Sequence, residues 1–154
     1  MSQETAGPFK TIVTSLASVM LVPPVVFVLT GLGKSMSLVE VFNAMLAQYT
    51  GRPNLLITGA IGLLPLGAMG LVLWVHRRQK GAARTRKYLF RASMFALILV
   101  LIWANQEFWR VFLPQRISPG FPHGLELFIG PVFFAPVAMF VAMLAAWAIQ
   151  RFGR

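Results

Sequence analysis

The stretch that decides the fold is His76-Arg77-Arg78-Gln79-Lys80-Gly81-Ala82-Ala83-Arg84-Thr85-Arg86-Lys87, followed shortly by Arg91. Together with Arg91 it holds seven of the fourteen lysine and arginine residues, and it lies between two long apolar segments. Short loops rich in Lys and Arg remain on the cytoplasmic side of a membrane. We therefore predict a cytoplasmic loop here, and this placement sets the orientation of every other segment.

The composition is typical of a membrane protein. Hydrophobic residues make up 57% of the chain and charged residues 12%, whereas soluble domains have roughly 45–50% and about 25%. So little polar surface cannot cover a soluble fold. Because 154 residues suit one domain, residues 1–154 are expected to form a single integral membrane domain.

The meaning of the net charge of +10 depends on where the basic residues lie in the sequence. Basic residues flank apolar segments and no polar domain carries them, so we expect no nucleic-acid partner, although basic patches do bind phosphates. The pattern favours attraction of the basic loop 76–91 to anionic lipids. The chain has no cysteine, which excludes disulfides and thiolate metal sites, and no catalytic or metal-binding motif is recognisable.

Four segments are predicted to cross the bilayer as helices, near 11–33, 54–76, 88–112 and 126–149. The predicted fold class is therefore all-α, a bundle of four transmembrane helices in a bacterial cytoplasmic (inner) membrane. Ten Lys and Arg residues fall on the predicted cytoplasmic side and four on the other. Both termini are accordingly expected in the cytoplasm. Trp103, Phe108 and Trp109 fit an aromatic belt at the outer interface.

Residues 38–49 are predicted to form a short amphipathic helix. Ser37 and Glu40 fit a capping box at its start. The helix is expected to lie on the outer membrane surface or to fold back against the bundle. Its apolar residues follow helical spacing on one face: Leu38, Val41, Phe42, Met45, Leu46 and Tyr49.

Two further features concern helix shape and packing. Pro23-Pro24 falls near the middle of the first span and is expected to kink it, with neighbouring helices or the hydroxyls of Thr14, Ser15 and Ser18 as partners for the freed carbonyls. Small residues in the second span allow another helix to approach closely. The predicted helix-packing residues are Gly59, Gly62, Gly67 and Gly70.

Polar residues concentrate at the periplasmic end of the third span. Glu107 and Arg110 are three residues apart and can pair on one helix face. The pair is either an interfacial ion pair that ends the helix or part of a functional site, since ionisable residues near membrane depth are functional candidates. The candidate cluster comprises Glu107, Arg110, Asn105, Gln106, Lys34 and His123.

Thr30-Gly31-Leu32-Gly33-Lys34, the short amphipathic helix and the glycine-rich second span resemble the DoxX/DoxD-like family of small four-helix bacterial membrane proteins. Glu107-Phe108-Trp109 at the end of the third span is compatible with it. The resemblance implies quinone-linked thiosulfate oxidation or an accessory membrane subunit. We expect no cofactor in the chain itself, although the resemblance allows a quinone. Many members carry an acidic residue in the second span, where this chain has Gly59-Ala60-Ile61-Gly62.

Two functional interpretations follow. In the first, the chain is a non-catalytic accessory subunit that packs its glycine faces against a protein partner or a second copy. In the second, it is a small membrane enzyme or transporter whose site surrounds Glu107. A buried glycine surface that faces a partner favours the first, and an enclosed polar cavity that reaches Glu107 favours the second.

Overall fold

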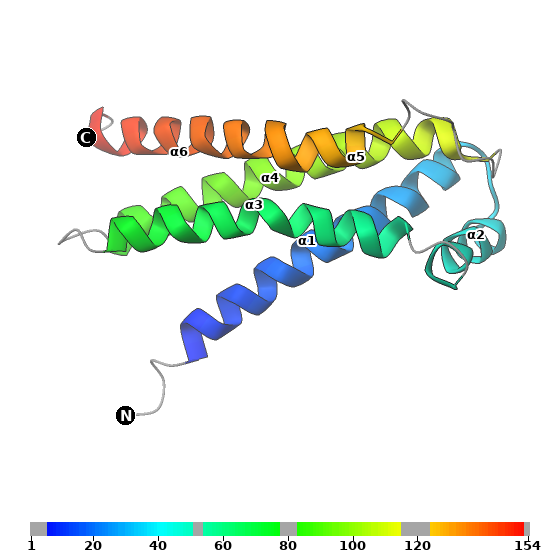
Figure 1. Ribbon diagram of the computed structural model, residues 1–154, viewed down its shortest axis with the longest axis horizontal. Helices are drawn as coiled ribbons and strands as arrows, with labels where there is room; N and C mark the ends of the chain where they lie inside the picture. Colours follow the sequence, from blue (N-terminus) through cyan, green and yellow to red (C-terminus); the bar gives the residue numbers. More distant parts are fainter. Residues whose placement is uncertain (1–5, 51–53, 78–82, 115–123, 153–154) are drawn as a thin grey trace.

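The computed structural model describes residues 6–50, 54–77, 83–114 and 124–152 (Figure 1). The predicted helical segments agree with the observed helices to within a few residues, except that 88–112 begins earlier and 126–149 is divided. The elements are α1 Ala6–Gly33, α2 Leu38–Thr50, α3 Asn54–Arg77, α4 Ala83–Phe112, α5 Glu126–Ile129, the π-helical segment η1 Gly130–Phe134, and α6 Ala135–Phe152.

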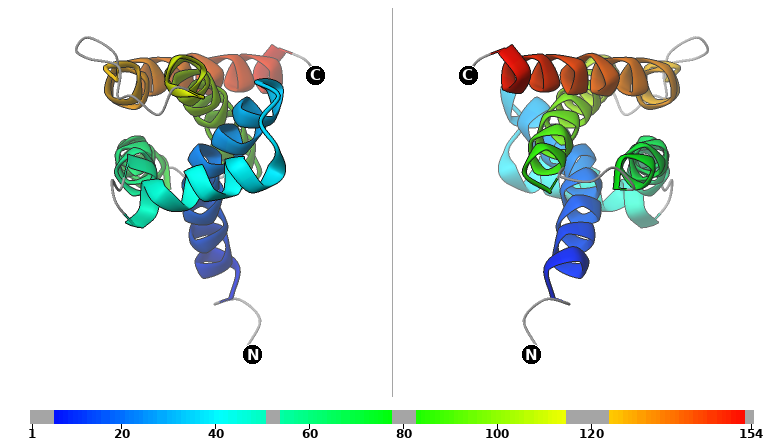
Figure 2. Two further views of the ribbon diagram at one scale, coloured as in Figure 1. Left: turned by 90° about the vertical axis from the view of Figure 1, so that its right-hand side faces the viewer. Right: turned by 90° about the vertical axis from the view of Figure 1, so that its left-hand side faces the viewer.

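The long helices alternate in direction along the molecule. The start of α1, the end of α3, the start of α4 and the end of α6 all lie at one end, which we call the basic end (Figure 1). The opposite end carries α2 and is called the α2 end. The side view of Figure 1 and the end views of Figure 2 agree that the first half of α1 leaves the other helices towards the basic end. The chain therefore forms a bundle that is tight near α2 and opens towards its basic end.

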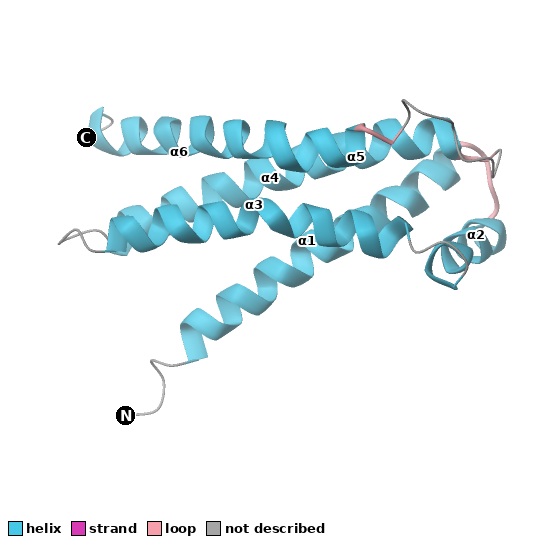
Figure 3. Ribbon diagram, in the orientation of Figure 1, coloured by secondary structure: helices cyan, strands magenta, loops and turns pink. Residues whose placement is uncertain are grey.

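Three helical stretches are long and apolar enough to cross a membrane: Lys10–Gly33, Thr85–Phe112 and Glu126–Phe152. In α3 the apolar part among the described residues is the shorter stretch Leu55–Gly67. Helices connected by turns make up all the regular structure of the described ranges, without any strand (Figure 3). An all-helical fold with at least three potential spans agrees with the predicted class.

Helix α1 continues through Pro23 and Pro24. The first half of α1 carries the hydroxyls of Thr14, Ser15 and Ser18. Each hydroxyl donates a hydrogen bond of 2.7–2.8 Å to the carbonyl four residues earlier. The carbonyls that lose their N–H partners to the prolines belong to Val19 and Met20, one or two turns further on. The expectation that these hydroxyls satisfy the freed carbonyls was wrong, because a hydroxyl reaches back along its own helix and not forward.

The corner between α1 and α2 is a Schellman motif. Ser35 adopts a left-handed φ of 61°. The Met36 N–H donates to the Gly31 carbonyl at 3.2 Å, and the Ser35 N–H donates to the Leu32 carbonyl at 3.0 Å. Both bonds satisfy carbonyls at the end of α1. A Cβ at Gly31 would lie 2.7 Å from Val41 Cγ2, so glycine is what allows α2 to fold back this closely.

Helix α2 begins with the predicted capping box. The Ser37 N–H donates to Glu40 Oε2 at 2.8 Å, and the Glu40 N–H donates to Ser37 Oγ at 3.3 Å. The helix packs against α1 and α3, with Val41 and Gln48 buried and Phe42 exposed on the outside. The buried face is thus rotated from the expected one, because α2 is covered from two sides by its neighbouring helices.

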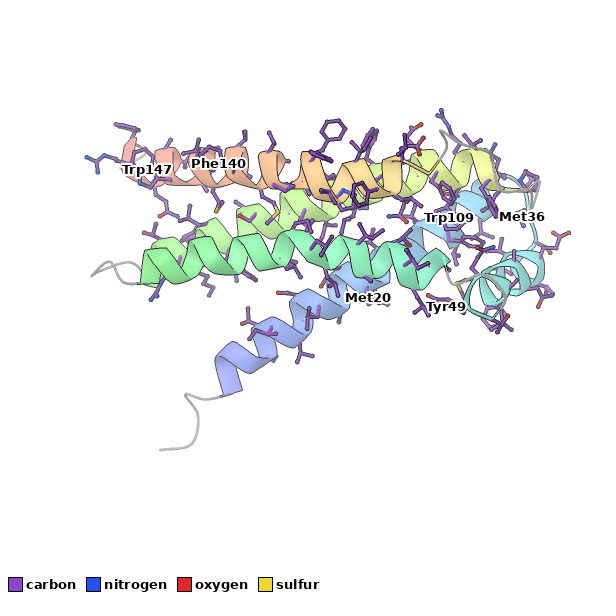
Figure 4. The ribbon with its side chains drawn as sticks, viewed as in Figure 1. Met20, Met36, Tyr49, Trp109, Phe140 and Trp147 are labelled. Atoms are coloured by element: carbon purple, nitrogen blue, oxygen red, sulfur yellow. The ribbon has the colours of Figure 1, made fainter. Side chains whose placement is uncertain are left out.

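The core lies along α4, which packs against α1, α3 and α6. Trp109 is fully buried and meets Phe27 edge-on at 4.7 Å and Phe108 at 4.6 Å between ring centroids (Figure 4). The expectation that Trp109 and Phe108 belong to an interfacial belt was therefore wrong, whereas Trp103 is exposed. The largest buried aliphatic side chains of this core are Leu55, Leu97, Leu101, Leu113, Val19 and Val41.

The predicted last helix is divided by a π-helical turn. The Ala135 N–H bonds to the Gly130 carbonyl, five residues earlier. The turn contains Pro131 and is followed by Pro136, and the N–H groups that these prolines lack remove regular α-helical bonds. A Cβ at Gly130 would lie only 2.7 Å from the Ala104 Cβ. Here α4 and η1 make a close contact through small residues.

Candidate functional site

The predicted ion pair between Glu107 and Arg110 is present on the surface of α4. Arg110 Nη2 lies 3.4 Å from Glu107 Oε2, and the two side chains are 61% and 36% exposed, respectively. Exposed pairs of this kind contribute about 0–1 kcal/mol to stability. The pair therefore adds little to the stability of the fold, and it lies at the α2 end of the molecule.

A groove between α1 and α4 joins three members of the candidate cluster. Lys34, Gln106 and Arg110 line it, together with Thr30. Its volume is about 410 Å³. The rest of its wall is apolar or small: Val26, Leu29, Gly33 and Ile102. We call this site the Lys34 groove.

The Lys34 groove is built from two helical repeats. Thr30 and Lys34 are four residues apart on α1, and Gln106 and Arg110 are four residues apart on α4, so each pair shares a helix face. Lys34 follows the last turn of α1, where its N–H donates to the Thr30 carbonyl at 3.1 Å. The groove presents ammonium, guanidinium and amide N–H donors at one end and aliphatic side chains at the other.

Glu107 does not line this groove, although it was the centre of the predicted cluster. Residues 106 and 107 are separated by about 100° around the helix. Gln106 therefore faces the groove, while Glu107 pairs with Arg110 along the helix surface. Arg110 is the residue that belongs to both features.

Asn105 is separated from the rest of the predicted cluster by burial. It is 2% exposed, and its amide donates to the Leu101 carbonyl at 2.8 Å. Its Oδ1 has no hydrogen-bond partner in the described structure. Asn105 therefore faces the core, one turn before Trp109. His123 lies outside the described residues.

The four predicted packing glycines fall into two groups. A Cβ at Gly59 would lie 2.9 Å from Met20 Sδ, and one at Gly62 would lie 3.2 Å from Val19 Cγ1. These two glycines face α1. At Gly67 and Gly70 no described atom lies within 4 Å of the corresponding position. The second group is exposed where α1 has moved away from α3 (Figure 1).

The sequence analysis did not identify several residues that the structure shows to line the groove or to make close helix contacts. Thr30 was overlooked as a groove residue, although its spacing to Lys34 was a usable signal. Gly31 and Gly130 make closer contacts than any of the four predicted glycines. Their signal was weaker, because a glycine at a helix end is usually interpreted as a terminator rather than as a contact.

Among the described residues, no group of three or more His, Asp or Glu side chains is placed to hold a metal ion. Comparison of the chain with known protein families, curated proteins and solved structures finds no match. The DoxX/DoxD-like resemblance therefore stays a prediction. Fold and site together define a class: an all-helical bundle with at least three helices able to span a membrane and a cationic groove at one end.

Proposed function

We propose that this chain is a non-catalytic accessory subunit of a complex in the bacterial cytoplasmic membrane. It crosses the membrane four times, and the basic end and both termini lie in the cytoplasm. Its role is to hold a protein partner through the open face of α3. A quinone is the associated cofactor of the complex.

One observation carries the proposal: the face of α3 that packs on α1 continues beyond that contact. Gly70 follows Gly59 by about three turns and points to almost the same side of the helix. Gly59 is closed by Met20, which lies between α1 and α3 (Figure 4), whereas Gly70 is open. Small residues that face an open wedge allow a further helix to approach closely. We therefore assign the wedge between α1 and α3 to a partner helix.

The fourth span is supported by length and direction. Helix α3 has 24 residues, which corresponds to about 36 Å of helix against the roughly 30 Å of the hydrocarbon core. It runs antiparallel to α1 and α4 over the same part of the molecule (Figure 1). Placing the basic end in the cytoplasm follows the bias of Lys and Arg towards that side.

The lining of the Lys34 groove is the argument for a quinone as the cofactor. Quinone carbonyls accept hydrogen bonds, and Lys34, Gln106 and Arg110 supply donors. An isoprenoid tail would follow the aliphatic wall formed by Val26 and Leu29. The alternative, an enzyme or transporter centred on Glu107, receives less support because that carboxylate does not line the groove.

The partner-binding face is tested by enlarging it. In Gly70→Leu we expect the amount of co-purified partner in mild detergent to fall about tenfold, while thermal stability stays unchanged because the new side chain meets no described atom. Ala60→Leu is the matched control, because Ala60 is also exposed on α3 but points about 80° away from Gly70 around the helix axis. Equal recovery of the partner with both variants, or a wild-type chain that is alone in its native membrane, contradicts the proposal.

A cross-linking experiment at residue 70 identifies the helix that occupies the wedge between α1 and α3. The chain has no cysteine, so Gly70→Cys carries a single thiol. Oxidation that gives disulfide-linked dimers indicates a second copy, and cross-linking to another chain indicates a different subunit. In the same preparation, Glu107→Gln separates the two functional interpretations: an accessory subunit keeps its partner, whereas an enzyme or transporter loses its activity.

A further inference from the structure

A second groove lies between α1 and α4 at the basic end. Its volume is about 370 Å³. We call it the Lys10 groove. It is lined by Lys10, Thr11, Thr14, Ser15, Lys87, Phe90 and Arg91.

The residues of this groove share two helix faces. Lys87 and Arg91 are four residues apart on α4, and Lys10 and Thr14 are four residues apart on α1, so each pair points to one side. Nearly eighty residues of sequence separate the two walls. The fold, rather than the local sequence, brings Lys10 to the basic residues of α4.

The three cations of the Lys10 groove have no described carboxylate near them. Of the four acidic residues, Glu40, Glu107 and Glu126 lie at the α2 end, and Glu4 lies outside the described residues. Three like charges that line one groove repel each other unless an anion lies between them. The charge arrangement therefore favours an anionic ligand.

The hydrogen-bond donors that remain for such a ligand are those of the cations. Thr14 donates its hydroxyl proton to the Lys10 carbonyl at 2.7 Å, and Ser15 donates its proton to the Thr11 carbonyl at 2.8 Å. The ammonium groups and the guanidinium are left to bind the anion. Arg and Lys together are a common set for phosphate oxygens.

The position of the groove decides which kind of anion it takes. Lys10 immediately precedes the uncharged residues 11–33, and Arg91 immediately precedes the uncharged residues 92–106. The groove thus lies where both helices pass from charged to apolar sequence. Phe90 and the aliphatic parts of the Lys side chains add an apolar wall. A ligand that carries a phosphate beside hydrocarbon chains matches both the cations and the apolar wall of the groove.

We propose that the Lys10 groove binds the headgroup of an anionic phospholipid, with its phosphate between Lys10, Lys87 and Arg91. The acyl chains extend along the apolar parts of α1 and α4. The lipid thereby bridges the two helices at the end where they separate. This proposal depends on the membrane placement of the chain and is independent of its role as an accessory subunit.

The test is lipid binding by the full-length chain in neutral detergent. Phosphatidylglycerol is titrated at constant ionic strength, with phosphatidylcholine as the neutral comparison, and bound lipid is counted by native mass spectrometry. We expect phosphatidylglycerol to bind with clear preference. Lys10→Gln and Arg91→Gln are each expected to weaken it roughly fivefold, the usual contribution of one cation near an anionic lipid.

Arg86→Gln is the matched control, because Arg86 is adjacent to Lys87 in the sequence but does not line the groove. It removes the same charge and should change binding less than about twofold. An equal loss with Arg86→Gln would overturn the site and indicate diffuse attraction by net charge. Equal binding of the two lipids, or displacement of phosphatidylglycerol by millimolar inorganic phosphate, would overturn the lipid assignment. We expect the Arg91→Gln variant to keep its association with a protein partner. A loss of lipid binding can then be distinguished from a failure of the proposed function.

Discussion

Trp109 shows how much one buried residue organises the α2 end of the bundle. Its ring meets Phe27, Phe108 and Phe112 at centroid distances of 4.6–5.3 Å, each in an edge-on arrangement. Such pairs contribute about 0.5–1.5 kcal/mol each beyond the area that they bury. Its Nε1 nevertheless has no hydrogen-bond partner in the described structure. The ring stabilises the core, whereas the indole N–H opposes burial.

Two substitutions at Trp109 separate these effects. Trp109→Ala should lower the free energy of unfolding by about 3–5 kcal/mol, because it leaves a cavity in the aromatic core. Trp109→Phe should cost less than about 1.5 kcal/mol, because it retains an aromatic ring and removes the unpaired donor. Equilibrium unfolding in mixed micelles measures both values. A phenylalanine variant as unstable as the alanine variant would mean that Nε1 has a partner in the membrane.

At the scale of the element, α2 is stabilised at its start by a local device and placed by its neighbours. Ser37→Ala removes the Oγ that accepts the Glu40 N–H, and we expect the opening free energy of the first turn of α2 to fall by about 1 kcal/mol. Hydrogen exchange of the Glu40 amide measures this change. Thr50→Ala is the control, because its hydroxyl bonds to the Leu46 carbonyl at the other end of α2. If the Glu40 amide exchanged faster than in the wild type by the same factor in both variants, the result would argue against the cap.

At the scale of the whole molecule, the basic residues are expected to determine the orientation in the membrane. Reporter domains fused at Gly81 and at Gly120 should report opposite sides, with Gly81 in the cytoplasm. Neutralising the Lys and Arg residues between 77 and 91 should reduce this orientation bias, because they supply most of the charge on that side. Protease protection in membrane vesicles provides an independent measurement. Two reporters on the same side would exclude the arrangement of four spans.

The sequence by itself determined the local features of this protein. The lengths of the apolar runs predicted the helices, and the spacing of Ser37 and Glu40 predicted the cap. The interval between Glu107 and Arg110 predicted their ion pair. Each of these depends on residues within one or two turns of the same helix. Backbone periodicity fixes such distances without any knowledge of the rest of the chain.

Only the tertiary structure decided which helix faces are buried. In a soluble helix the polar face identifies the opposite side as buried, but α1 and α3 are apolar nearly all round and give no such signal. The sequence therefore could not separate the closed Gly59 from the open Gly70, or place Trp109 inside. The two grooves depend in the same way on how α1 crosses α4. That crossing results from contacts between residues distant in the sequence, at which small side chains permit a close approach and large ones fill the space that remains.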